Sequence, residues 1–409
     1  MWQRWAVRRN RHSSGAPLHL SIVEPGTMTL RLLVVEVAAG QSTVLGWAEG
    51  PGWTGAEAKP EWLVDICGEA LARAEQMAQV PGERWILPDQ VIVGLPASQL
   101  RGRAWTIVQR RSRTDKAVDE REVEALLDRS LRLAVNRLRG DDPDSEGWLL
   151  LDAALVALTV DGRGVTDLVG FRGREIGATV FAALARKDVI ENWGLVAREL
   201  EFSSLTLTAT PLALAGGLST PHGILVDVGG TTTDLIWCRT GQPAMLESLP
   251  AGGAALTGSL MRKWNLVTER AERLKHAYSL GKLDAEAKAQ VLEVLTPGLQ
   301  AWLGETEAAM ARLNQEEPLP QHLYLCGGGS GLPEITDAVR ALAWSRRLHF
   351  VRYPQVSHLR PTDVPGVVNR TNLGHGPGDV SALALAAWAA WQQQPPNRPA
   401  RILDELCQG

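Results

Sequence analysis

The stretch that decides the fold is Asp227-Val-Gly-Gly-Thr-Thr-Thr-Asp234, which lies between the apolar runs Gly223-Ile-Leu-Val226 and Leu235-Ile-Trp-Cys238. Two apolar runs around a Gly/Thr turn predict a β-hairpin rather than a strand-to-helix phosphate loop. Adjacent glycines let backbone N–H groups approach an anion, and threonine hydroxyls add donors. Two carboxylates would repel a bare phosphate, so we expect Mg²⁺ or an oriented water beside them. The alternative is an ordinary hairpin turn with solvated aspartates.

A similar hairpin is predicted about half a chain earlier. The apolar run Leu18-His-Leu-Ser-Ile-Val23 leads into Glu24-Pro-Gly-Thr27, and a second strand is expected over Leu30 to Val37. Both loops place an acidic residue at the end of a strand, followed by Gly and Thr. A repeat of this period predicts two related lobes rather than a solenoid. Arg31, just inside the second strand, is placed to offer a permanent positive charge to the same phosphates.

A third glycine-rich turn, Gly327-Gly-Gly-Ser-Gly331, follows the apolar run Leu323-Tyr-Leu-Cys326 and precedes a predicted helix from Glu334 to Trp344. Such a turn lets a flat ligand, such as a nucleotide base, approach the backbone. Alone it is equally compatible with an ordinary turn. The three loops together predict a nucleotide site between two lobes.

Length and composition set the outer limits. The length of 409 residues suggests two to four lobes. The composition, with 45% hydrophobic and 22% charged residues, excludes a largely disordered chain. A net charge of −4 argues against a general nucleic-acid binder. The longest apolar run, Ala382 to Trp391, is too short to cross a membrane. Four scattered cysteines lack metal-ligand spacing and favour a reducing cytoplasm.

The N-terminal segment, Met1 to His12, has neither the apolar core nor the cleavage site of a signal peptide. It combines aromatic and basic side chains, which suit the interface of an anionic membrane. The residues expected to contact such a membrane are Trp2, Trp5, Arg4, Arg8 and Arg9. The alternative is a solvated basic tail.

The three loops resemble those of the ATPase superfamily of actin, heat-shock chaperones and sugar kinases. Within it, Ala271-Glu-Arg-Leu-Lys275, following Ala251-Gly-Gly-Ala254, is similar to the bacterial FtsA and PilM branch. Ala154 to Gly164 and Gly170 to Ile176 resemble the insertion that replaces one actin subdomain in FtsA. The resemblance covers about residues 18 to 390. It implies an α/β, actin-like (ribonuclease H-like) fold with two lobes and four subdomains.

The resemblance also implies boundaries. We expect a basic Trp/Arg segment at 1–17, subdomain 1A at 18–97 and 185–220, an inserted α+β subdomain 1C at 98–184, subdomain 2A at 221–255 and 319–391, subdomain 2B at 256–318, and a linker and tail at 392–409.

The roles of the site residues follow by position from the resemblance. Asp227 and Glu24 are the expected catalytic residues and would hold Mg²⁺ through water. The expected ATP- or ADP-binding residues are Gly26, Thr27, Arg31, Gly229, Gly230, Thr231, Thr232, Asp234, Gly252, Gly253, Glu272, Lys275, Gly327, Gly328, Gly329 and Ser330. Without the resemblance, Glu272 and Lys275 would be read as an i,i+3 pair on a helix surface.

Three positions depart from the family pattern. Glu24 stands where the family has Asp, and the extra methylene moves the carboxylate by about 1.5 Å. Arg31 replaces a lysine, and Thr231 replaces the third glycine of the FtsA loop, as in relatives such as hydantoinases and enzyme reactivases. We therefore expect nucleotide binding with weak, Mg²⁺-dependent hydrolysis at most.

The leading hypothesis is a cytoplasmic, nucleotide-controlled adaptor or filament-forming scaffold at a membrane-associated assembly of the cell-division or pilus type. Its expected partners are ATP, a protein of that assembly, further copies of itself and an anionic membrane, with no nucleic acid. One alternative is a reactivase- or hydantoinase-like ATPase that serves a partner enzyme. Another is a scaffold that no longer uses nucleotide, which Glu24 suggests.

Overall fold

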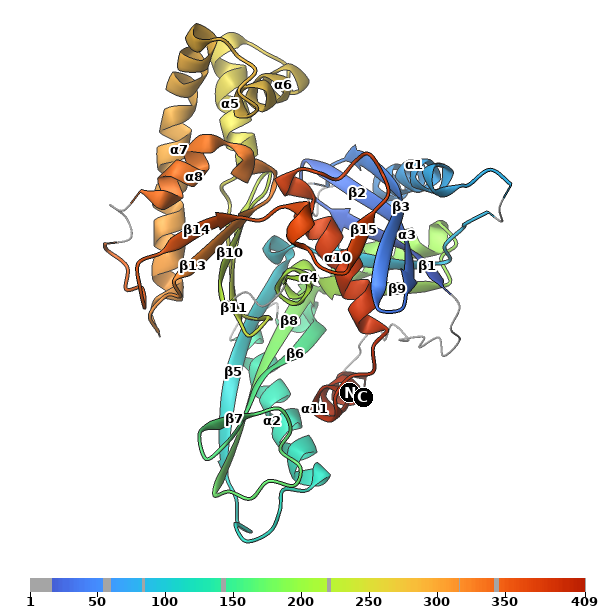
Figure 1. The fold of residues 1–409 in the computed structure, drawn as a ribbon, viewed down its shortest axis with the longest axis vertical. Coiled ribbons are helices and arrows are strands. Elements are labelled where there is room, and N and C mark those ends of the chain that lie inside the picture. The colour runs from blue at the N-terminus through green and yellow to red at the C-terminus, as the bar shows by residue number, and fades with distance from the viewer. Residues whose placement is uncertain are drawn as a thin grey trace.

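The structure is a computed structural model, and it describes residues 17–53, 60–82, 85–140, 145–218, 222–315, 317–341 and 346–408. Two mixed sheets form the two lobes, and a third lobe extends from the second sheet (Figure 1). The predicted membrane contacts Trp2, Trp5, Arg4, Arg8 and Arg9 lie outside the described residues.

The sheet of lobe I has the strand order β15-β3-β2-β1-β4-β9. Its strands are β1 (Leu18–Pro25), β2 (Thr29–Ala38), β3 (Gln41–Pro51), β4 (Gln90–Leu95), β9 (Ser204–Ala209) and β15 (Val367–Asn369). Helices α1 (Pro60–Ala78) and α3 (Lys187–Glu199) share a buried cluster with one face of this sheet. In α1 the buried residues recur at helical spacing, from Leu63 through Cys67 and Ala70 to Ala78, so one stripe of the helix faces the strands.

The sheet of lobe II repeats this topology. Its strands are β10 (Gly223–Val228), β11 (Thr233–Arg239), β12 (Gln242–Leu249), β13 (His322–Cys326) and β14 (Gln355–His358). In each lobe a three-stranded antiparallel meander is followed by a strand parallel to its first strand. Even the meander turns correspond, because Ala39-Gly40 and Thr240-Gly241 all have positive φ, as a type I′ hairpin turn requires. The internal repeat therefore reflects two lobes of the same construction.

A subdomain of helices covers the outer face of lobe II. It contains α5 (Gly253–Trp264), α6 (Thr268–Ser279) and the long α7 (Ala285–Leu313), with α8 (Pro333–Arg340) at its base. These helices share one buried cluster with β10, β11 and β13. The predicted helix from Glu334 to Trp344 ends earlier within the described residues, at Arg340.

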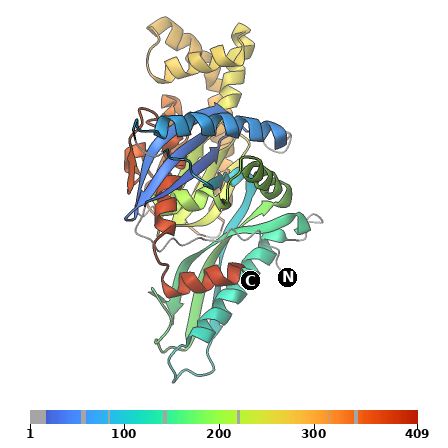
Figure 2. The same ribbon diagram turned by 90° about the vertical axis from the view of Figure 1, so that its right-hand side faces the viewer.

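The inserted lobe extends the lobe II sheet to nine strands, in the order β14-β13-β10-β11-β12-β5-β8-β6-β7. Its elements are β5 (Leu100–Arg110), α2 (Glu120–Arg139), β6 (Trp148–Val160), β7 (Arg163–Val165) and β8 (Glu175–Arg186). The central strand β8 was not foreseen from the sequence. One bridge, Met245 to Arg103, joins β5 to β12 of lobe II. The tail contains a helix, α11 (Arg398–Gln408), which buries Ile402 and Leu403 against the insertion (Figure 2).

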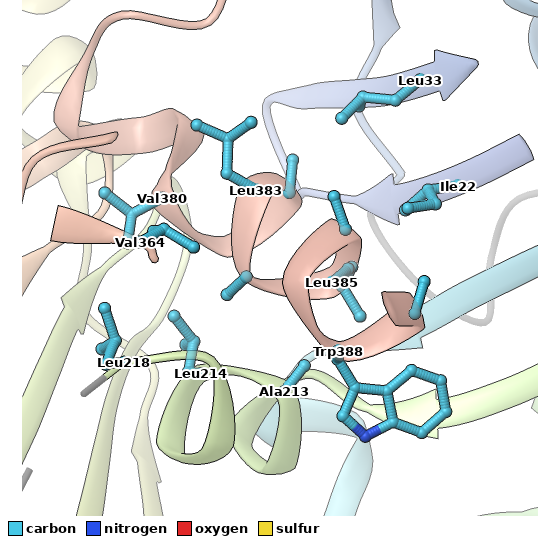
Figure 3. Packing of buried hydrophobic residues seen from close by; sticks show 14 of the residues in the cluster. Ile22, Leu33, Ala213, Leu214, Leu218, Val364, Val380, Leu383, Leu385 and Trp388 are labelled. Carbon is cyan, nitrogen blue, oxygen red and sulfur yellow. The ribbon is translucent and has the colours of Figure 1, made fainter. Parts of the chain in front are cut away.

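Two helices cross between the lobes. The helices α4 (Thr210–Gly217) and α10 (Val380–Gln392) pack on each other and against both sheets. Figure 3 shows α10, with Leu383, Leu385 and Trp388, lying between Ile22 and Leu33 of lobe I on one side and Ala213 and Leu214 of α4 on the other. The Ala-rich sequence of α10 therefore forms a buried core, as expected from its short length. Across the described part of the chain, no helix has the length and apolar character needed to span a membrane.

Candidate functional site

The first and second loops occupy equivalent hairpin turns at the facing edges of the two lobes. In lobe I, Glu24 pairs across the strands with Arg31. In lobe II, Asp227 pairs with Asp234 at the corresponding position. The repeated fold therefore places an acidic residue at the same point of each lobe. Its cross-strand neighbour is a cation in one lobe and a second carboxylate in the other.

The glycines of these loops are required by close backbone approaches. A Cβ on Gly26 would lie 2.5 Å from the carbonyl oxygen of Thr29, and one on Gly252, which packs on the second loop, would lie 2.5 Å from the carbonyl oxygen of Gly230. The amino end of α5 then docks on the second loop, where Gly253 N–H donates to the Gly229 carbonyl at 3.0 Å. The first and second loops also touch, because Thr231 N–H donates to Thr27 Oγ1 at 3.1 Å.

Between the lobes lies a cavity of about 770 Å³. Most of the predicted site residues line it, and these are Glu24, Gly26, Thr27, Arg31, Asp227, Gly229, Gly230, Thr232, Asp234, Gly253, Glu272, Lys275, Gly327, Gly328 and Gly329. The remaining three lie just behind this wall. Thr231 contacts Thr27, Gly252 packs on the second loop, and the buried Ser330 donates to the Gly327 carbonyl at 2.7 Å. One cleft thus gathers residues from the three loops and from α5 and α6.

Arg31 is bound on both sides by carboxylates. Its Nη1 donates to Glu24 Oε2 at 3.0 Å, and its Nε donates to Asp379 Oδ1 at 2.7 Å. Burial would lower the pKa of Arg31, but the two carboxylates outweigh it and raise that pKa above its ordinary value. The guanidinium is therefore charged and already engaged, and it contributes little net positive charge to the cleft.

Asp379 belongs to a segment that the sequence analysis missed. The turn Gly376-Pro-Gly-Asp-Val-Ser381 leads into α10 and touches all three loops. Its Asp379 binds Arg31 near the first loop, and Ser381 Oγ donates to Asp227 Oδ2 at 3.2 Å near the second. The carbonyl of Pro377 accepts from Gly327 N–H at 3.0 Å at the third. A Gly-Pro-Gly-Asp turn before an apolar helix was the available signal, and its remoteness from the loops concealed it.

The carboxylates at this end of the cleft are strongly affected by burial. Burial raises the pKa of Glu24 and that of Asp227 above their ordinary values, and Arg31 opposes both shifts. Burial also raises the pKa of Asp234 to about 7, against a hydrogen bond from Ser248. The partners only partly offset burial, so this end of the cavity favours protons or a cation.

Magnesium fits this environment through water and ligand oxygens rather than through a protein cage. Within the ranges that the structure describes, no three His, Cys, Asp or Glu side chains converge on a metal position. Glu24 and Asp227 both face the cavity, and Mg²⁺ commonly keeps several waters and binds through one or two carboxylates. Those two residues would hold it.

Helices α5 and α6 form another part of the cavity wall, beside the second loop. Lys275 Nζ donates to Gly253 O at 3.0 Å, to Thr257 Oγ1 at 2.6 Å and to Glu272 Oε1 at 2.9 Å. The Lys275 side chain is only 14% exposed, so the pair with Glu272 is not an ordinary surface ion pair. Thr257, which the sequence analysis missed, also donates to Glu272. Further unpredicted residues at this rim are Arg273, His276, Ser279 and Lys282.

Comparison with known proteins gives consistent similarities. The family model described as cell division protein FtsA matches residues 224–363. The cell division protein FtsA of Neisseria meningitidis serogroup B (strain ATCC BAA-335 / MC58) is 23% identical over 289 residues. That alignment covers 69% of this chain and 66% of the relative, slightly less than two thirds of its length.

Solved structures with a similar fold include the PilM-PilN type IV pilus biogenesis complex. It matches with a TM-score of 0.63 and 19% identity, over 94% of this chain and all (100%) of the other. A weaker likeness is to MreB 5 of Spiroplasma citri bound to AMPPNP, with a TM-score of 0.45 and 12% identity over 90% of this chain and 95% of that one.

Proposed function

We propose, from the actin-like ATPase fold and the likeness to FtsA and PilM, that this protein is a nucleotide-controlled adaptor or scaffold. ATP or ADP would bind with Mg²⁺ in the cleft between the lobes. Because both lobes contribute loops to that cleft, a bound nucleotide would favour their closed arrangement. Closure would then alter the affinity for a partner protein of a cell-division or pilus-type assembly, or for further copies of the chain.

The observation that carries this proposal is the single cavity wall built from three distant loops and α6. The first two loops supply backbone N–H groups and hydroxyls for phosphates, and Glu272 with Lys275 supplies polar contacts for a nucleoside. Since Arg31 is already bound to two carboxylates, Mg²⁺ would supply the positive charge that the phosphates need. Asp227 and Glu24 would hold the ion through water and orient an attacking water for slow hydrolysis.

At the membrane, the proposed role is peripheral and on the cytoplasmic side. The N-terminal residues Trp2, Trp5, Arg4, Arg8 and Arg9 would contribute the attachment. Their aromatic and basic character supports this assignment, since it matches the interface of an anionic bilayer.

Titration calorimetry with ATP and ADP, in Mg²⁺ and in EDTA, tests the proposal. The parent should bind both nucleotides in Mg²⁺, and EDTA should weaken binding at least tenfold. Asp227→Asn should weaken Mg²⁺-dependent binding to a similar degree, because it removes a charge near the ion. The control Glu293→Ala changes an exposed carboxylate on α7 and should bind like the parent.

One observation favours a second function, a scaffold that no longer uses nucleotide. Arg31 is held by Glu24 and Asp379, so it is not free to contact a phosphate. If the parent binds neither nucleotide in Mg²⁺, the adaptor proposal fails and the scaffold remains. A reactivase-like ATPase would instead bind nucleotide and act on a partner enzyme without self-assembly.

A further inference from the structure

Ser381 is a buried hydroxyl in the first turn of α10 that donates outside its own helix. The residue is 4% exposed, and its Oγ donates to Asp227 Oδ2 at 3.2 Å. A serine or threonine within a helix commonly donates instead to the carbonyl four residues earlier. Ser259, Thr296 and Thr306 all do so in this chain. The contact between Ser381 and Asp227 is therefore not a by-product of helix geometry.

The carbonyl that Ser381 would ordinarily use is bound by the third loop. Four residues before Ser381 is Pro377, whose carbonyl accepts from Gly327 N–H at 3.0 Å. Gly327 has a φ of +83°, and a Cβ there would lie 2.2 Å from Asp227 Oδ1. The Asp227 carboxylate is thus confined between two groups, with Gly327 against Oδ1 and the Ser381 hydroxyl on Oδ2. These two contacts together fix its direction.

The turn that carries Ser381 is also anchored to lobe I. Two residues earlier, Asp379 accepts from Arg31 Nε at 2.7 Å through Oδ1 and from Gly376 N–H at 2.8 Å through Oδ2. Both oxygens of Asp379 are therefore bound, which holds the turn against β2. Residues two apart in a helix point about 200° apart, so Asp379 and Ser381 can face opposite lobes. A group held by lobe I thereby orients Asp227, which belongs to lobe II.

We propose that Ser381 is a positioning residue for the Mg²⁺ site, and that it orients the Asp227 carboxylate that would hold the ion. This inference rests on the proposed nucleotide function and deepens it. Mg²⁺ demands near-ideal octahedral geometry, so a carboxylate that holds it must keep its direction. Partners that orient metal ligands in this way typically change metal affinity by about 10–100-fold.

The contact also gives nucleotide binding a defined effect on the lobes. A separation of the lobes would draw the turn before α10 away from Asp227 and weaken metal binding. Because coupling between two equilibria is reciprocal, Mg²⁺ and nucleotide would in turn stabilise the arrangement in which Ser381 reaches Asp227. The site is therefore complete only when the two lobes and the turn are together.

The test is titration calorimetry of ADP binding in Mg²⁺ and in EDTA. The quantity compared is the Mg²⁺ enhancement, the ratio of the ADP affinity in Mg²⁺ to that in EDTA. Ser381→Ala should lower this enhancement about tenfold, the loss of one hydrogen bond to a charged group. Ser381→Thr keeps the hydroxyl and should retain the parent enhancement, since Ser381 borders the cavity and the added methyl group has room there.

Ser42→Ala is the matched control. The Ser42 hydroxyl is also buried, and it donates to the Ala386 carbonyl of the same helix at 2.6 Å, away from the residues that line the cavity. Its loss should leave the Mg²⁺ enhancement within twofold of the parent. Melting temperatures in EDTA provide a readout without metal or nucleotide. Ser381→Ala and Ser42→Ala should lower them by similar amounts, so a difference in enhancement does not arise from stability.

A double variant separates positioning from general support of the site. In Asp227→Asn the charge that Ser381 orients is gone, so adding Ser381→Ala should change the enhancement less than twofold. An undiminished further loss there would overturn the proposal. So would an unchanged enhancement in Ser381→Ala, or an equal loss in Ser42→Ala, and the nucleotide function would then still stand. If the parent binds no ADP in Mg²⁺, the proposed function fails and this inference fails with it. Alanine is the best helix former, so Ser381→Ala should fold.

Discussion

At the scale of residues, the site is organised around Arg31 and the carboxylates that surround it. Arg31, Glu24 and Asp379 have side chains that are 16%, 12% and 12% exposed, so their charges are largely removed from water. An ion pair in such a setting contributes little net stability, but the loss of one carboxylate removes a buried, charged hydrogen bond and leaves Arg31 with Glu24 alone.

The variant Asp379→Asn should therefore destabilise the protein more than a surface change does. Since Glu24 still pairs with Arg31, we expect the free energy of unfolding to fall by about 2 kcal/mol, the loss of one charged hydrogen bond, measured by urea denaturation. Glu175→Gln is the matched control, because Glu175 pairs with Arg110 on the surface, where the side chains are 39% and 89% exposed. The free energy of unfolding of that variant should stay within about 0.5 kcal/mol of the parent value. Equal effects of the two variants would contradict the assigned role of Arg31.

Asp234 gives a pH dependence whose sign follows from its environment. Its pKa of about 7 in the folded chain exceeds the ordinary value, so the folded state keeps a proton that the unfolded state loses. This contribution to stability is present at low pH and is lost as pH rises towards 7. Asp234→Asn removes the titration. The difference in melting temperature, variant minus parent, should therefore be roughly 3 °C larger at pH 8 than at pH 5, because only the parent loses stability as Asp234 ionises. Parallel pH profiles would refute this explanation.

At the scale of elements, helix α1 is packed unusually close to strand β3. A Cβ on Gly46 would lie 2.0 Å from the Ala74 carbonyl oxygen, which belongs to rigid helical backbone. Gly50 on the same strand has its nearest neighbour at 3.8 Å. Replacing each of these two glycines by alanine therefore separates the cost of a steric clash with α1 from the general effect of adding a methyl group to β3.

Gly46→Ala should force α1 away from the sheet and lower the free energy of unfolding by about 2 kcal/mol. Gly50→Ala should be nearly neutral, since its methyl group meets only ordinary contacts. Urea denaturation of the two variants measures the difference directly. Equal stability would show that α1 yields at little cost, and would weaken the view of lobe I as a rigid support for the first loop.

Helix α11 illustrates an element whose place depends on distant parts of the chain. It buries Ile402 and Leu403 in the insertion, and Arg401 binds Glu120 at the start of α2 at 2.9 Å. The short sequence after residue 397 has apolar residues at helical spacing, but nothing local identifies the surface that receives them. The tertiary structure supplied the partner.

At the scale of the whole molecule, two lobes of equivalent topology enclose one cleft. Helices α4 and α10 join them through a shared buried core, and the turn before α10 contacts the loops on both sides. Movement of one lobe would therefore be transmitted to the other through this turn. The inserted lobe continues the lobe II sheet by a single bridge, although its sequence interrupts lobe I. It also packs on lobe I, where Phe181 and Ala183 of β8 join the buried cluster of α1 and α3.

The sequence by itself determined the repeated hairpins, the three glycine-rich loops and half of the residues that line the cleft. These are encoded locally, because a turn that brings backbone within 3 Å of another chain segment admits only glycine. Asp379, Ser381 and Thr257 were missed because their role arises from long-range packing, which local pattern does not report. Only the tertiary structure showed that Arg31 is already neutralised by two carboxylates.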